Sequence, residues 1–186
     1  MIIESISHTV EVKRNFVKPA EQVVRKLAED YSKSYMSYRN AVWLDNSGAD
    51  YFIIGRIPAL EFLLQSLNQS RLVKLVKIGT SFDQIQNVKF ESFPMIGESA
   101  IRGVLEYYEA AQSEVCRAYH ASMISPGNRF VLENWLGASS VYEEFLAAIG
   151  QSQAALRIAN FAINRLNAQV FHKLAQNSQH ERIFTH

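Results

Sequence analysis

The chain has 186 residues, of which 48% are hydrophobic and 20% are charged, and its formal net charge is +1. This composition excludes the disordered and membrane-spanning classes, and the small net charge excludes a global field that steers nucleic acid or acidic partners to the protein. The length suits a single domain over 1–186, in which we expect an α/β portion at 1–93 and a helical portion at 97–177.

The cysteine content and the first residues predict a location. Cys116 is the only cysteine, so no intramolecular disulfide can form, and the cytoplasm is the expected compartment. Residues 1–15 include Glu4 and His8, where a secretory signal needs an unbroken apolar run. No stretch approaches the roughly 20 apolar residues of a membrane span, so we expect no membrane insertion.

The first pattern along the chain is an alternation. Over residues 2–13, apolar and polar side chains alternate with the period of a half-buried strand. Pro19 and Glu21 then suit a first helical turn, and an apolar stripe continues from them at helical spacing to about Asp45. We therefore predict a strand near 2–13 and a long helix after it.

The next segments contain further strand signals. Residues 51–57 are rich in β-branched and aromatic side chains and predict a short buried strand, after which Pro58 is expected to open a helix. Residues 71–78 fit either the end of that helix or a strand, and residues 85–93 alternate weakly. We prefer to interpret these two segments as a hairpin that turns near Gly79.

The C-terminal half has a helical pattern throughout. A stripe of apolar side chains predicts one long helix that ends just before Pro126. Two shorter helices at 129–136 and 141–149 are expected next, separated by Gly137, and Ser140 has the position of a helix cap for the second. Strands followed by helices predict an α+β fold with a small N-terminal sheet, rather than a doubly wound sheet.

The last predicted helix, at about 152–176, lies in a stretch with no acidic residue between Glu144 and Glu181. Ordinary solvent-facing helices interleave Glu with Lys, whereas this one carries amides, arginines and small residues. Its expected inward stripe is Leu156, Ala159, Ile163, Leu166, Val170 and Leu174. Its expected polar face is Gln153, Arg157, Asn160, Asn164 and Asn167.

This polar face suits three roles. It could be an ordinary solvated surface, or an interface with a second copy or a larger assembly, because amides and Arg form hydrogen bonds across an interface without burying an unpaired charge. It also suits a nucleic-acid backbone, on which Arg157 and Arg165 would contact phosphates. Arg71, Lys74 and Lys77 would extend such a surface if their segment is helical, but as a strand they would protect a sheet edge.

Catalysis and metal binding have little support in the sequence. Cys116 and His120 are one helical turn apart and could place a thiolate beside an imidazole, although a buried cysteine is usually inert. No Glu-x-x-His pair and no phosphate-binding glycine loop occurs, so we expect neither a metal nor a cofactor. The sequence predicts a non-enzymatic assembly subunit, with nucleic-acid contact as the alternative and an enzyme with a site hidden in the sequence as a further one.

Overall fold

The computed structural model describes residues 5–12, 21–43, 50–79 and 97–183, and for 170–183 it describes the helix alone. All regular structure in these residues is helical, so the predicted α+β fold with an N-terminal sheet is wrong. The helices are α1 (Glu21–Trp43), α2 (Tyr51–Ser66), α3 (Ser70–Lys77), α5 (Glu98–Ile124), α6 (Arg129–Ala148) and α7 (Ser152–Ile183). A 3₁₀ turn, Pro126–Asn128, joins α5 to α6.

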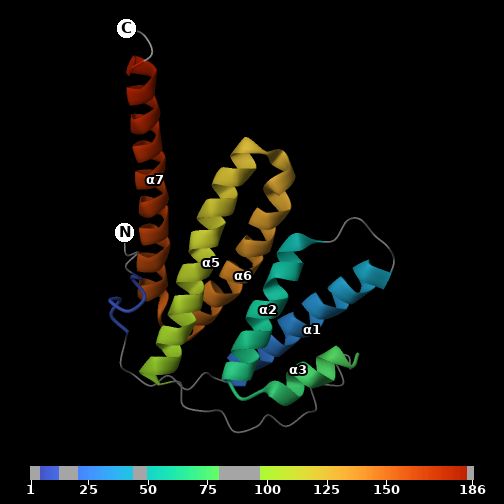
Figure 1. The fold of residues 1–186 in the computed structure, drawn as a ribbon. Helices are drawn as coiled ribbons and strands as arrows, with labels where there is room; N and C mark the ends of the chain where they lie inside the picture. The colour runs from blue at the N-terminus through green and yellow to red at the C-terminus, as the bar shows by residue number, and fades with distance from the viewer. Residues whose placement is uncertain (1–4, 13–20, 44–49, 80–96, 184–186) are drawn as a thin grey trace.

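Five of the helices lie side by side in the order α1, α2, α6, α5, α7 (Figure 1). α5 and α6 form an antiparallel hairpin in the middle of this row, and α3 packs against α1 and α2 at one side. α7 forms the opposite edge, where it packs mainly on α5 and extends beyond the ends of its neighbours (Figure 1). The second half of α7 therefore has few neighbours within the described chain.

The apolar core runs along the row and draws on every helix. Its largest fully buried side chains include Tyr31, Leu60, Leu63, Leu72, Leu105, Tyr108 and Leu146, and Ile158 of α7 is also fully buried. Burying a side chain of this size stabilises the fold by about 1.5–3 kcal/mol. Burial raises the pKa of Tyr108 to about 12, so its hydroxyl stays neutral and accepts a hydrogen bond from Gln112 at 2.9 Å.

Residues 51–57, predicted as a strand, form the first turns of α2. Asp50 marks the start of the helix, because its side chain accepts a hydrogen bond from the backbone N–H of Ile53 at 3.2 Å. α2 packs against both α1 and α6, so it is apolar on several sides and has no clear helical period. Pro58, expected to open a helix, lies inside α2 instead.

The preferred hairpin interpretation is also wrong at residues 71–78, since Ser70–Lys77 form α3. Leu72, Val73 and Val76 are buried at helical spacing, which agrees with the helix that was the alternative prediction for this segment. The predicted strand at 85–93 lies outside the described residues.

The described part of the predicted strand 2–13, residues 5–12, forms a turn and no strand. The backbone N–H groups of Thr9 and Val10 both donate to the carbonyl of Ile6, at 2.9 and 3.0 Å. Val10 and Val12 are buried, as the alternation predicted, but the side chain of Ser7, expected on the polar face, is buried as well. The turn holds the segment against α5 rather than in a sheet.

Two side chains of α5 form hydrogen bonds with the backbone of this turn, as a neighbouring strand would in a sheet. The carboxylate of Glu109 accepts hydrogen bonds from the Ser5 hydroxyl and from the backbone N–H groups of Ile6 and Ser7, at 2.8, 3.0 and 2.8 Å. Arg102 donates to backbone carbonyls of the same turn, the nearest being that of His8 at 3.0 Å. These contacts satisfy backbone groups that a sheet would otherwise have paired.

Residues 129–148 form one helix rather than the predicted pair separated at Gly137. Ser140, expected as a helix cap, is inside α6 and donates to the carbonyl of Gly137 at 2.8 Å. Gly137 has a packing role: a Cβ there would lie 2.0 Å from the backbone oxygen of Phe52, and one at Gly55 would lie 1.8 Å from that of Asn134. The two glycines allow α2 and α6 to cross in close contact.

Candidate interaction surface on the last helix

The first turns of α7 are anchored in the core. Gln151, Ala154, Ala155, Ile158 and Ala162 are buried. Their spacing of three and four residues defines one face of the helix, which packs against α5 and α6. Beyond Ala162, no residue up to Gln169 is buried, so the anchored part of the described surface ends there.

The stripe predicted to face inward lies elsewhere on the helix. The outer stripe, as we call it, consists of Leu156, Ala159, Ile163 and Leu166. Leu156 is 54% exposed and Ile163 is 49% exposed, and the other two are half-buried. The side chains of Val170 and Leu174, predicted to continue it, lie outside the described ones. α7 therefore carries two apolar faces, and only one of them is covered by the described chain.

The predicted polar face is exposed as expected. We call it the polar row, and it consists of Gln153, Arg157, Asn160, Asn164 and Asn167. In the part of the chain that the structure describes, these side chains make no hydrogen bond or ion pair. The polar row is therefore available to bind something outside the described chain.

Five arginines on other helices differ from Arg157 and Arg165 of α7. Arg25, Arg56, Arg102, Arg117 and Arg129 each form an ion pair with a carboxylate. Arg157, on the exposed side of α7, and Arg165, half-buried, form no such pair with any described residue. The lack of acidic residues between Glu144 and Glu181 explains this difference, because no carboxylate is available at helical spacing.

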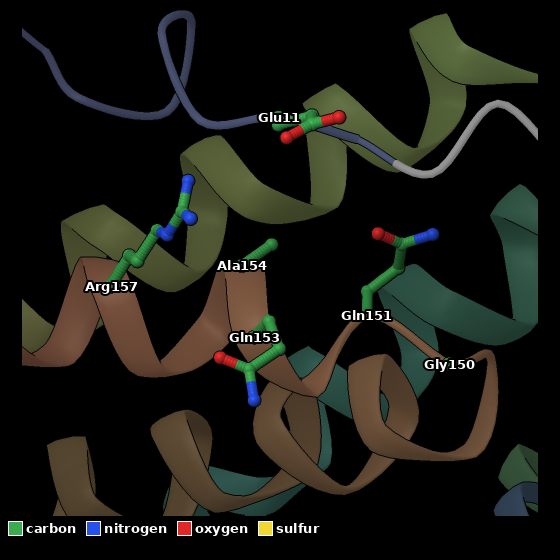
Figure 2. Close-up of a pocket in the computed structure, with 6 residues that line it drawn as sticks. All are labelled: Glu11, Gly150, Gln151, Gln153, Ala154 and Arg157. Carbon is green, nitrogen blue, oxygen red and sulfur yellow. The ribbon is translucent and has the colours of Figure 1, made fainter.

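A hollow of about 230 Å³ lies beside the start of the polar row. Figure 2 shows the side chains of Arg157 and Gln151 on either side of Ala154, with the carboxylate of Glu11 facing them from the N-terminal segment. The hollow is completed by Gly150 and Gln153. Glu11 brings a negative charge to one end of the polar row, and no pattern in the sequence predicts that residue 11 lies beside α7.

The other predicted basic residues form a separate surface. Arg71, Lys74 and Lys77 are exposed on α3, which is helical as their grouping required. α3 lies across the row of helices from α7, so these cations do not join Arg157 and Arg165 (Figure 1). Lys77 is also paired with Glu61 at 2.6 Å.

The remaining chemical candidates show no site. Cys116 and His120 are both half-buried on α5, and burial raises the pKa of the Cys116 thiol, which disfavours the thiolate that a nucleophile needs. Among the described residues, no group of three or more His, Cys, Asp or Glu side chains is placed to hold a metal ion. Within the same residues, no helix has the length and apolar character to cross a membrane.

The outer stripe is the part of α7 for which the sequence prediction is wrong, because Leu156 and Ile163 are exposed rather than inward. The apolar pattern predicts that Leu156 and Ile163 face the core. In the structure, a different and mostly smaller set of α7 residues is buried. Alanines at 154, 155 and 162 mark that set, and their small side chains give a weak hydrophobic signal. Comparison with protein-family models, curated proteins and solved structures found no match, so the surface of the chain itself supports the proposal of a function.

Proposed function

We propose that this chain is a non-enzymatic assembly subunit that associates through the exposed faces of α7. The observation that supports this proposal is the polar row, whose Arg157 and amides have no partner within the described chain. Amides and guanidinium groups suit such a surface, because they form hydrogen bonds with a partner and bring no carboxylate that the partner would have to neutralise. The neighbouring outer stripe adds apolar area that a partner would bury.

Introducing charge into the polar row tests this proposal. The double substitution Asn160→Glu with Asn164→Glu places two carboxylates on a helix that has no acidic residue before Glu181, so it should lower the mass of the assembly or prevent binding to the partner. Size-exclusion chromatography with light scattering measures the mass. A control variant with Asn40→Glu, on the exposed side of α1, adds charge on another helix and should leave the mass and the partner binding unchanged. If the mass and the partner binding of the double variant equal those of the wild type, the proposal is wrong.

A second proposal is contact with nucleic acid through Arg157 and Arg165. Its support is the lack of a carboxylate partner for either guanidinium in the described chain. Binding should then weaken steeply as salt rises, and the slope should fall by about one for each phosphate-contacting cation removed. Arg71→Gln, on the distant α3, is the control and should leave the slope unchanged. Absence of binding to duplex or single-stranded DNA or RNA at roughly 50 mM salt would end this proposal.

A further inference from the structure

We infer that the partner of α7 is a second copy of this chain, whose own outer stripe packs against the first. This inference rests on the proposed function and makes its partner specific. The outer stripe consists of Leu156, Ala159, Ile163 and Leu166, and its residues follow one another at intervals of three, four and three. This alternation is the spacing at which two helices interlock their side chains along a shared seam.

The charges around the stripe favour a partner of the same kind. At about 100° per residue, Arg157 and Arg165 each lie about 140° around the helix from the centre of the stripe. Two copies that meet along the described stripe therefore keep Arg157 and Arg165 away from the seam. Between residues 152 and 169, no charged residue lies nearer to it. A seam without charge has no like-charge repulsion to oppose pairing between identical surfaces.

The amides bordering the stripe are self-complementary. Asn160 and Asn167 lie on its solvent side and are exposed. A side-chain amide both donates and accepts hydrogen bonds, so it can pair with the same residue across a two-fold axis. A cationic or anionic border would instead require a partner of opposite charge. The uncharged border thus selects a second copy over a strongly acidic or basic protein.

The described side chains of α7 beyond Ala162 have little packing within the described chain. Ile163, Asn164 and Asn167 are exposed, and Leu166 is half-buried. No acidic residue lies between Glu144 and Glu181 to form an ion pair at helical spacing, and Asn164 and Asn167 are poor helix formers. Tertiary packing usually supplies the stability of such a helix, and a second α7 packed over Ile163 and Leu166 would add to it.

The test is the mass of the full-length chain, measured by light scattering over a wide range of protein concentration, for the wild type and two variants. Ile163→Asp puts a charge in the centre of the stripe. Ile78→Asp is the matched control, since Ile78 is 76% exposed at the end of α3. The wild type should be a dimer, and Ile163→Asp should raise the dissociation constant by about 100-fold or more, because each copy would bury a charge at the seam. Ile78→Asp should have the wild-type constant.

Each other outcome overturns the inference. If the wild type is a monomer at every concentration, the partner is not a second copy, while the charge substitutions at Asn160 and Asn164 still decide whether α7 binds another protein. If the wild type is a dimer that Ile163→Asp leaves intact, the copies do not meet along the outer stripe and the inference is wrong, while the charge substitutions at Asn160 and Asn164 decide whether they meet elsewhere on α7. Both variants should fold, because Ile163 and Ile78 are exposed in the described chain. Circular dichroism of both variants checks this, so that loss of the dimer is not mistaken for loss of the fold.

Discussion

Glu109 shows how one buried carboxylate can organise a segment without regular structure. Its side chain is buried, and burial alone would raise its pKa. Hydrogen bonds from Ile6, Ser5 and Ser7 together outweigh this effect and hold the pKa below the ordinary value of 4.5. Folding therefore favours the ionised carboxylate. The resulting stability is fully present above pH 4.5 and decreases as the pH falls through the lowered pKa of the folded chain.

We predict that Glu109→Gln lowers the free energy of unfolding by about 1–3 kcal/mol at neutral pH, because a glutamine cannot accept all of the hydrogen bonds that the carboxylate receives. The variant should also lose part of the decrease in stability below pH 4.5. Urea unfolding at neutral and acidic pH measures both effects. Glu114→Gln, on the same helix but paired with the exposed Arg117, is the control and should cost less than about 1 kcal/mol. Equal effects of the two substitutions would contradict this role for Glu109.

At the scale of elements, α2 and α6 cross with their backbones in close contact. Gly55 and Gly137 each face the backbone of the opposite helix, at distances that leave no room for a Cβ. A glycine inside a helix usually costs about 1 kcal/mol relative to alanine. At this crossing the close approach of two backbones offsets that cost, because it brings the apolar faces of both helices into contact.

We predict that Gly137→Ala destabilises the fold by roughly 1–3 kcal/mol, although alanine is the better helix former, because the two helices must move apart to admit the methyl group. Gly103→Ala on α5 is the matched control. A Cβ there meets nothing within 4 Å, so this variant should gain about 0.5–1 kcal/mol from helix propensity. Thermal unfolding of both variants makes the comparison. A stabilising Gly137→Ala would show that the helices are less closely packed than described.

The sequence predicted helices well where one face is polar, and it failed where burial removes that contrast. α1 and α5 have long stripes with solvent on the other side, and both were predicted. α2 packs between two helices, and its residues 51–57 are rich in β-branched and aromatic side chains that fit a strand equally well. Gly137 was interpreted as a helix break, since a sequence does not show that another backbone passes beside it. Small residues on a helix mark both breaks and close crossings.

The candidate surface was predictable in part for the same reason. The polar row is exposed as its residues indicated, because amides and arginine are rarely buried without partners. The rotation of the helix was not predictable. Larger side chains at Leu156 and Ile163 gave a stronger apolar signal than the alanines that are buried. Helix packing selects small residues where two helices approach closely, and hydrophobicity alone does not reveal that selection.

At the scale of the whole molecule, a single arginine forms ion pairs with two neighbouring helices. The guanidinium of Arg56 on α2 lies 3.5 Å from Asp30 on α1 and 3.1 Å from Glu144 on α6, and it also donates to Ser140 at 2.8 Å. Its side chain is only 14% exposed. Burial raises the pKa of Asp30, and the nearby Arg56 opposes this rise. One arginine therefore links three neighbouring helices of the row.

We predict that Arg56→Met costs about 3 kcal/mol of stability at neutral pH, because it leaves the partly buried Asp30 without its cation. The pKa of Asp30 should rise further, so the variant should become relatively more stable as the pH is lowered towards 5. Arg129→Met removes an exposed ion pair within α6 and should cost less than about 1 kcal/mol. Chemical denaturation across this pH range measures both. A loss that does not depend on pH would show that Arg56 acts through packing alone.

The attachment of the N-terminal turn to Glu109 has a consequence for how the protein is made. Ile6 and Glu109 are separated by 103 residues, so the turn emerges from the ribosome long before its docking site exists. At synthesis rates of about 5–20 residues per second, this delay is roughly 5–20 s. During that time Val10 and Val12 have no apolar core to pack against, and the backbone N–H groups of the turn cannot yet donate to the carboxylate of Glu109. This segment is thus translated well before α5 and reaches its native place only after α5 has been made.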